Sequence, residues 1–275
     1  MVAQTMKLKV SQFFLKNLVV IMFAPHALAL PISYPDQGLL PPVRSEVFKN
    51  LDLRIGTVKV CEVNQKARIP SFRVVMDFNQ GFEDLKQSSA QLQDNYHAGE
   101  DQIREEAADG RLKNRLYGLQ VAAITNFPKR SVGIPSFFLT LGVVSLNGED
   151  TGTVVISPSI PVSDGIQVKL LNDNESSIHQ GRRSITDYAE TFHRLDIRVG
   201  TVTSLAEKRV DFGSELGSFT YRGDYPLFQE GLQVLRAINL EDLHDQDNFL
   251  GVVNEDRQLI PLTLERSLPN GRFLK

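Results

Sequence analysis

Basic, amide and hydroxyl side chains cluster at three places before residue 130. Arg68 and Arg73 flank an aromatic residue, Lys86 opens a stretch rich in Ser and Gln, and Asn126 begins an Asn-Phe-Pro-Lys run. Guanidinium and ammonium groups neutralise phosphates, hydroxyls and amides bond phosphates or base edges, and a phenyl ring offers a stacking face. The candidate contact residues are Arg68, Arg73, Lys86, Ser88, Ser89, Gln91, Asn126, Phe127 and Lys129.

Each of these stretches also has a structural interpretation. Residues 86–91 have the composition of a solvated turn, and residues 126–130 that of a strand end stopped by Pro128. Arg54 and Arg198 are left out of the set because each follows an aspartate at i−2, which favours an ion pair within the chain. Composition alone leaves the role of the three stretches open.

The sequence offers no constellation that catalysis or metal binding requires. Its five histidines are scattered without metal-ligand spacing, and it has no phosphate-loop, nucleophile-elbow or dinucleotide-binding pattern. The single cysteine, Cys61, can form neither an intrachain disulfide nor a cysteine-built metal cage, and it suits a small buried strand position. We expect a protein that is not an enzyme and that holds no metal or other cofactor.

Charge and composition restrict where a nucleic acid could bind. The 275 residues are 41% hydrophobic and 23% charged, which is ordinary for a globular protein, and the formal net charge is −3. Because phosphate attraction depends on where Lys and Arg lie, any such site must be a local patch.

The chain contains an internal repeat. Residues 48–58 return as residues 192–202 with seven of eleven positions identical, residues 118–121 return as 231–234, and residues 164–165 match 270–271. The offset falls from 144 to 113 and then to 106, so the second repeat is the shorter one. We divide the chain into a leader (1–43), a first repeat (44–172), a polar linker (173–186) and a second repeat (187–275).

Strand patterns dominate the first repeat. Phe72, Val74, Met76 and Phe78 alternate with less apolar residues, the period of a half-buried strand. Further β-branched or apolar runs cover residues 53–63, 119–125, 137–144 and 153–157. Five strands in about 120 residues predict a five-stranded Greek-key barrel, so we expect an all-β chain of two OB-folds in tandem with short helices. Residues 99–115, dense in Glu, Ala, Arg and Lys, predict a charged surface helix inserted in a loop.

The first repeat resembles the tRNA-binding domain family, over residues 48 to about 170. The matching motifs, in family order, are Leu51–Val58 (L-D-L-R-I-G-T-V), Glu62, Ala67–Pro70 (A-R-I-P), Asp77-Phe78, Ser88–Gln91 (S-S-A-Q), Asn126–Pro128 (N-F-P) and Asp164-Gly165. The nearest type by pattern is CsaA, a dimeric protein described as an export-related chaperone and tRNA binder. The resemblance implies an OB-fold that binds structured RNA, with the Ser88–Gln91 loop near the binding face. Asn79, which replaces a family glycine, and the 99–115 insertion depart from the pattern.

The second repeat has kept the scaffold motifs and lost the others. It retains Leu195–Val202 (L-D-I-R-V-G-T-V) and Asp211–Gly213, but Ser218–Tyr221 stands where S-S-A-Q is expected. Residues 187–275 hold 10 Lys and Arg against 15 Asp and Glu, whereas residues 44–172 hold 15 of each. An acidic surface repels phosphate. We therefore predict that the second repeat binds no RNA and that it serves as a built-in partner for the first, although a homodimer remains an alternative.

The sequence leaves the cellular location and the client open. Lys7, Lys9 and Lys16, the apolar run 18–24 and Ala27-Leu28-Ala29 have the form of a short secretory signal, and the run is too short to span a bilayer. We expect a cytoplasmic protein, with export as the alternative if residues 1–29 act as a signal. The predicted function is non-catalytic binding of tRNA-like RNA, and the alternative is a peptide-binding, export-related chaperone.

Overall fold

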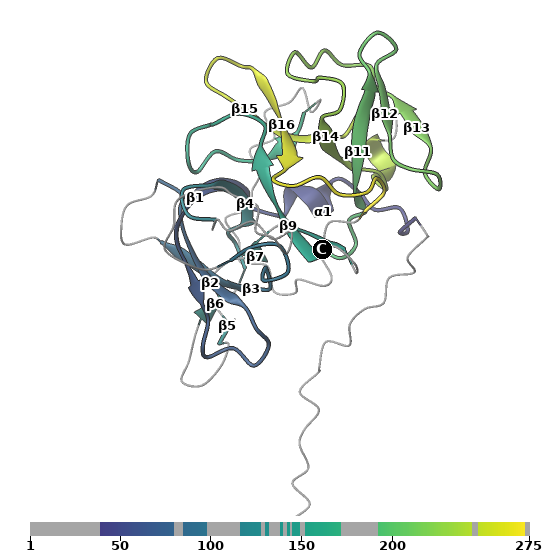
Figure 1. The fold of residues 1–275 in the computed structure, drawn as a ribbon. Coiled ribbons are helices and arrows are strands. Elements are labelled where there is room, and N and C mark those ends of the chain that lie inside the picture. Colours follow the sequence, from purple (N-terminus) through teal and green to yellow (C-terminus); the bar gives the residue numbers. More distant parts are fainter. Residues whose placement is uncertain are drawn as a thin grey trace, which may run out of the picture. The chain divides into compact units, whose positions relative to one another are not determined.

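The computed structural model describes residues 39–79, 85–97, 116–127, 130–131, 138–139, 142–143, 145–148, 152–171, 192–243 and 247–272. Within them the chain is all-β, with curled antiparallel sheets of the OB type, which confirms the predicted fold class (Figure 1). The leader up to residue 38, the 99–115 insertion, Lys129 and the 173–186 linker lie outside the described residues.

The described elements are two short helical turns and sixteen strands. They are α1 (Glu46–Lys49), β1 (Leu53–Val63), β2 (Phe72–Asp77), β3 (Lys86–Ala90), β4 (Gln120–Ile124), β5 (Arg130–Ser131), β6 (Phe138–Leu139), β7 (Gly142–Val143), β8 (Ser145–Gly148), β9 (Gly152–Pro158), β10 (Lys169–Leu170), β11 (Ile197–Ser204), β12 (Arg209–Asp211), β13 (Ser218–Thr220), β14 (Gln233–Ala237), η3 (Glu241–Leu243), β15 (Leu250–Val253) and β16 (Leu259–Leu264).

The long strand β1 organises the first repeat. It pairs antiparallel with β2 along one part of its length and with β4 along the other, in a sheet of order β3-β2-β1-β4-β7. The alternating residues of β2 behave as predicted, because Phe72, Val74 and Met76 are buried in one apolar cluster with Phe78. A register shift between Val58 and Val60 bends β1, as a β-bulge does.

The second repeat reproduces this arrangement with fewer residues. Strand β11 pairs with β12 and β14 in a sheet of order β13-β12-β11-β14. Its register shift lies between Val202 and Ser204, which are 144 residues after the two residues of the shift in β1. The bend is therefore built at the same place in both sheets.

A glycine in each bent strand makes room for a phenylalanine ring. A Cβ on Gly56 would lie 2.6 Å from the ring of Phe78, and one on Gly200 would lie 2.7 Å from the ring of Phe212. Such distances are shorter than real Cβ contacts. The glycine in the shared R-[IV]-G-T-V motif is thus required by packing, in each sheet separately.

A third sheet, of order β10-β15-β16-β9-β8, joins the two repeats. Its central pair is β9 from the first repeat and β16 from the second, with Ser157 opposite Thr263. The Ser159 N–H donates to the Pro261 carbonyl at 3.0 Å, and the Glu265 N–H donates to the Val155 carbonyl at 3.2 Å.

These two hydrogen bonds are related by symmetry. Residues 265 and 261 follow 159 and 155 by 106, the offset of the last sequence match, so each bond becomes the other when the repeats are exchanged. Ser157 and Thr263 differ by the same 106 and face each other. Equivalent strands that pair in this way form the contact of a two-fold dimer, here within one chain.

The largest apolar cluster is shared by both repeats. Leu53, Ile55 and Ile124 of the first repeat are buried with Ile197, Val199 and other residues of the second. Full burial of one such side chain contributes about 1.5–3 kcal/mol relative to exposure. This cluster therefore stabilises each repeat and also the association between the two.

Two sequence expectations are corrected. Residues 86–90, expected as a turn or loop, form the edge strand β3, hydrogen-bonded to β2 from Met76–Lys86 to Phe72–Ala90. Residues 137–144, expected as one strand, contain the two short strands β6 and β7. In both cases the partner strand, which the local pattern does not contain, decides where pairing occurs.

The predicted ion pairs are confirmed. Arg54 Nε lies 2.8 Å from Asp52 Oδ1, and Arg198 Nε bonds Asp196 Oδ1 in the same way. Among the described residues no helix is long and apolar enough to cross a bilayer, and no three His, Cys, Asp or Glu side chains are grouped to hold a metal ion.

Candidate nucleic-acid interface

Three strands of the first repeat present a row of polar side chains on their outer side. Glu62 of β1 lies opposite Arg73 of β2, and Arg73 lies opposite Ser89 of β3. Directly opposite residues in an antiparallel pair point to the same side of the sheet. Gln87, Ser89 and Gln91 alternate along the chain, so β3 and the residue after it add three hydrogen-bonding groups there. We call this side of β1, β2 and β3, with loop 64–71, the polar face.

Arg73 is held at the centre of the polar face. Its Nη1 lies 2.8 Å from Glu62 Oε1, and its Nε donates to Gln87 Oε1 at 3.2 Å. The Arg73 side chain is 36% exposed and the Glu62 side chain 57%. An ion pair this exposed is weak, about 0–1 kcal/mol, so a phosphate can compete for the guanidinium.

Loop 64–71, which joins β1 to β2, is fastened to the edge strand. Ser89 Oγ lies 2.7 Å from Ser71 Oγ and accepts a hydrogen bond from Asn64 Nδ2 at 2.8 Å. The Asn64 N–H donates to the Ser71 carbonyl at 2.8 Å, which closes the loop at its base. Lys66 and Arg68 are exposed on this braced loop. The braced loop thus carries two exposed cations close to the edge strand β3.

The register separates the predicted residues of the 86–91 stretch. Ser88 is 4% exposed and lies opposite Val74, which places it on the core side of β3. Lys86 lies opposite Met76 at the first position of the strand and is half-buried. Gln91 is exposed on the outer side. The geometry gathers Arg68, Arg73, Ser89 and Gln91, whereas Ser88 points into the fold.

Asn126 and Phe127 lie elsewhere. Asn126 is buried, its Oδ1 accepts the N–H of Asp52 at 3.0 Å, and its Nδ2 donates to the carbonyl of Asn50 at 2.9 Å. Phe127 packs against the cluster shared by the two repeats. The structure therefore gives both side chains intramolecular contacts away from the polar face, while Lys129 lies outside the described residues.

Four contributors to the polar face were missing from the predicted set. Asn64 and Ser71 brace the loop, Gln87 orients Arg73, and Lys66 adds a cation. The period of two along Gln87, Ser89 and Gln91 was a usable signal once residues 86–90 were known to be a strand. The cross-strand partners of Ser89 had no local signal.

The second repeat replaces this face with aromatic residues. Val210 lies opposite Phe219, as Met76 lies opposite Lys86, and the Tyr221 N–H donates to the Lys208 carbonyl at 2.8 Å. The register thus sets Phe219, Thr220 and Tyr221 against Lys86, Gln87 and Ser88, which shifts the sequence alignment by three residues. The β11–β12 turn has four residues between Ser204 and Arg209, against eight between Val63 and Phe72.

A buried aspartate closes this aromatic side of the second repeat. Asp247 Oδ1 accepts the Arg222 N–H at 2.9 Å, and its Oδ2 accepts the Gly223 N–H at 2.7 Å and the Tyr225 hydroxyl at 2.8 Å. Burial, then the Asp247 carboxylate, raises the pKa of Tyr225 well above its ordinary value. The Tyr225 ring stacks on Phe228 with centroids 4.6 Å apart. These contacts hold residues 222–228 over the core.

Arg236, a cation of this region, makes contacts within the protein. The Arg236 guanidinium lies 3.7 Å from the centroid of Phe219, and its Nε donates to the Asp247 carbonyl at 2.8 Å. Burial lowers the pKa of Arg236 to about 10, against the opposing effect of Asp247, so it stays charged at neutral pH. Its position corresponds to Ala123 of the first repeat, since Arg54 lies opposite Ala123 and Arg198 opposite Arg236.

No family model matches the chain. Among solved structures it is similar to the chaperone CsaA of Bacillus anthracis (31% identity, TM-score 0.36, 46% of this chain and 98% of that chain) and to the CsaA chaperone protein of Picrophilus torridus (20% identity, TM-score 0.36, 46% and 97%). It is also similar to the C-terminal domain of Plasmodium vivax p43 (16% identity, TM-score 0.40, 67% and 97%).

The two interpretations of Asn126 make different predictions. Replacing Asn126 by Ala leaves the buried Asp52 N–H without its partner, which costs about 1–3 kcal/mol, and it also removes the part-buried hydrogen bond to the Asn50 carbonyl, worth about 0.5–1.5 kcal/mol. We expect the melting temperature, measured by circular dichroism, to fall by at least about 4 °C. Gln91→Ala on the exposed outer side is the control and should leave it unchanged. An unchanged melting temperature for Asn126→Ala, with weaker RNA binding, would instead favour a contact role.

Proposed function

We propose that the chain is a non-catalytic RNA-binding protein that prefers tRNA-like structured RNA and binds it through the polar face of the first repeat. The observation that carries the proposal is Arg73 beside Gln87 and Ser89 on the outer side of the sheet, next to a loop that is fastened to Ser89 and carries the exposed Lys66 and Arg68. This is the strand 2–3 surface with its adjoining loop, where OB-folds bind oligonucleotides. The motif resemblance of the first repeat to the tRNA-binding domain family agrees with it.

The electrostatics favour a phosphate ligand on this face. Among the described residues of these strands and their loop, Lys59, Lys66, Arg68 and Arg73 outnumber the carboxylates Glu62 and Asp77, of which Asp77 Oδ2 lies 3.8 Å from Lys59 Nζ. Lys86 stays a proposed contact at the end of β3. Amides and hydroxyls beside such cations add hydrogen bonds to phosphate, ribose or base edges. Binding of this kind depends on the shape of the RNA and on contacts with its backbone. We propose that it takes place in the cytoplasm.

The second repeat is proposed to be a built-in partner that binds no RNA. Its net charge is −5, its corresponding strand carries Phe219 and Tyr221, and the aligned loop is four residues shorter. Its β16 pairs with β9 about the pseudo-two-fold axis, as a second subunit would. One chain therefore supplies the two halves of a dimer and a single RNA-binding face.

A second candidate function is peptide binding by a chaperone of the CsaA type. Two large apolar side chains are exposed at the loop of the polar face, Val63 just before it (58% exposed) and Ile69 within it (60% exposed). Single exposed apolar residues are common, but a pair beside a cationic loop can hold an apolar segment of an unfolded client. The first function is preferred because the charged and amide groups on this face outnumber the apolar ones.

RNA binding is tested with a double substitution. Arg68→Ala with Gln91→Ala should weaken tRNA binding in a filter assay about tenfold or more and lower the salt dependence by about one ion, because one phosphate contact is lost. Arg222→Ala with Gln229→Ala, a matched pair of exposed residues on the second repeat, should change neither. The proposal fails if the unsubstituted chain shows no tRNA binding at low salt.

A substitution that tightens binding checks the same face in the other direction. Glu62→Gln removes the carboxylate that holds Arg73 and should strengthen tRNA binding roughly three- to tenfold, with a steeper salt dependence. Glu207→Gln, which removes the equivalent exposed partner of Arg209 in the second repeat, is the control. Equal effects of both substitutions would mean that only net charge matters and would argue against a site at Arg73.

The built-in dimer predicts mass and stoichiometry. Light scattering should give 30.8 kDa for the free chain at micromolar concentration, because the strand edge that would pair between subunits is used within the chain. Saturation with tRNA should give one RNA per chain. A concentration-independent mass of twice this value, or two RNAs per chain, would contradict the assignment of the second repeat.

The chaperone function is tested by aggregation of an unfolded client enzyme. If it holds, Val63→Ser with Ile69→Ser should abolish suppression of aggregation, and an apolar peptide but not tRNA should compete with the client. Leu205→Ser, 43% exposed on the second repeat, is the control. Absence of suppression by the unsubstituted chain rejects this candidate.

A further inference from the structure

The residues before α1 cross onto the second repeat. The Val43 N–H donates to the Asn239 carbonyl at 2.9 Å, and the Val43 carbonyl accepts the Glu241 N–H at 3.0 Å. The Pro41 carbonyl accepts a hydrogen bond from Asn239 Nδ2 at 2.8 Å. Val43 and Leu240 form a parallel bridge, and both are buried in the shared cluster. We call residues 39–45 the strap.

Both ends of the strap are fixed by carboxylates of the second repeat. At its carboxyl end the Ser45 N–H and Oγ donate to Asp242 at 2.7 and 2.8 Å. Burial alone would raise the pKa of Asp242, but the bonds from Ser45 hold that pKa below its ordinary value. At its amino end the Leu40 N–H donates to Asp196 Oδ2 at 2.9 Å. These contacts span 156 to 197 residues of sequence.

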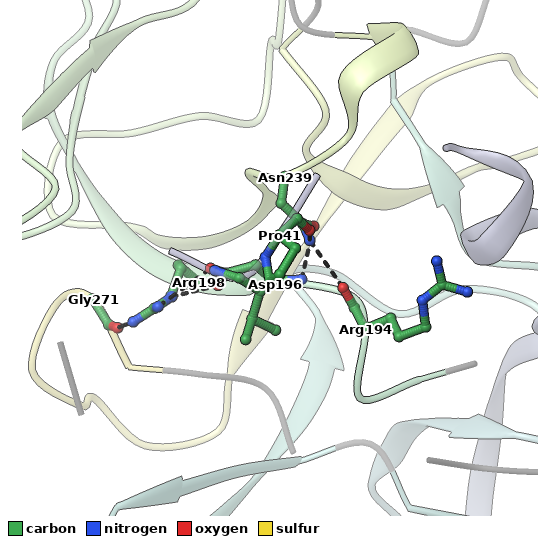
Figure 2. Close-up of polar contacts among 7 residues, drawn as sticks. Pro41, Arg194, Asp196, Arg198, Asn239 and Gly271 are labelled. Carbon is green, nitrogen blue, oxygen red and sulfur yellow. Dashed lines mark hydrogen bonds and ion pairs between the residues drawn. The ribbon is translucent and has the colours of Figure 1, made fainter. Parts of the chain in front are cut away.

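Asp196 is the buried end of a charged network. Its side chain is 0% exposed and that of Arg198 is 4% exposed. Figure 2 shows Arg198 reaching from Asp196 to the Gly271 carbonyl, which its Nη1 bonds at 2.9 Å, and Asn239 bonding both Pro41 and Arg194. A fully buried carboxylate that lacks hydrogen bonds is strongly destabilising, so each donor to Asp196 matters.

The first repeat satisfies the same carboxylate from within. Asp52 Oδ1 accepts Arg54 Nε at 2.8 Å, and Asp52 Oδ2 accepts the Thr125 hydroxyl at 2.7 Å. Thr125 corresponds to Ile238, because the Thr125 N–H donates to the Asp52 carbonyl as the Ile238 N–H does to the Asp196 carbonyl, both at 2.8 Å. Isoleucine has no hydroxyl. In the second repeat the donor that Thr125 provides is replaced by the main chain of the strap.

We propose that Asp196, Asn239 and Glu241 form a receptor for an extended main chain, and that its occupant is the chain's own residues 39–45, bound in cis. These three residues make four hydrogen bonds to main-chain atoms of the strap, as a sheet edge does with an added peptide. The strap completes the second repeat and ties it to the start of the first. Cleavage after Ala29, the site that the leader sequence offers, leaves the strap whole. A cut between residues 40 and 45 would instead leave Leu40, whose N–H donates to Asp196, on a different fragment from Asp196.

The test removes one N–H. Leu40→Pro deletes the shorter of two hydrogen bonds to Asp196 Oδ2, the other being donated by Arg198 Nη2 at 3.3 Å, and should lower the melting temperature of the full chain by about 4–8 °C. Leu39→Pro is the matched control, because residue 39 is exposed and its N–H is not among the donors that fasten the strap to the second repeat. It should lower the melting temperature by less than about 2 °C. Equal effects of the two prolines overturn the proposal.

A second substitution separates the lost donor from other effects of proline. Ile238→Thr restores the hydroxyl that the first repeat has, so in this background Leu40→Pro should lower the melting temperature by less than half as much. The same fall in both backgrounds overturns the assignment of the Leu40 N–H to Asp196.

Hydrogen exchange of the unsubstituted chain gives an independent measurement. The Val43 and Glu241 amides should exchange together and at least about a hundredfold more slowly than in an unstructured peptide, because they bond across the strap. Unprotected exchange at Val43 overturns the proposal even if the proline variants fail to fold.

Discussion

Where β9 meets β16, two equivalent strands pair antiparallel and make one sheet out of two repeats. The paired hydrogen bonds at Ser159 and Glu265 exchange when the repeats are exchanged, so the contact has the geometry of a two-fold dimer. The largest apolar cluster lies on both sides of it. Because this cluster takes side chains from both repeats, each repeat completes part of the core of the other, although each also has an apolar cluster of its own.

Around this contact the same staples appear twice. An Asp–Arg pair two residues apart reaches a glycine carbonyl, from Arg54 to Gly165 and from Arg198 to Gly271. A buried asparagine accepts the N–H of each aspartate. The repeats differ in what they add to this scaffold. The first carries a polar face with a braced cationic loop, and the second closes the corresponding surface with aromatic rings and Asp247.

This difference is consistent with the proposed phosphate site on a chain whose net charge is −3. Attraction for phosphate is local, since charges farther apart than about 8–10 Å are screened at physiological salt. Under the proposed division of roles, the second repeat is relieved of ligand binding and can accept substitutions that a binding repeat cannot, such as Phe219 beneath Arg236. The second repeat must still satisfy the hydrogen bonds of its buried carboxylate, Asp196. The strap, residues 39–45 at the amino-terminal side of the first repeat, supplies one of the donors.

The sequence by itself determined the repeat, because whole motifs recur 106 to 144 residues apart. It also determined the all-β class, the approximate extent of β1 and β2 and the two Asp–Arg pairs, because each of these depends on spacings of one to a few residues. Only the tertiary structure decided that residues 86–90 form an edge strand, that Ser88 points inward and Asn126 braces Asp52, and that Leu40 reaches Asp196. Those outcomes depend on partners in other elements, up to 156 residues away along the chain. A side chain's local pattern states which bonds it can make, and the fold chooses which group is near enough to make them.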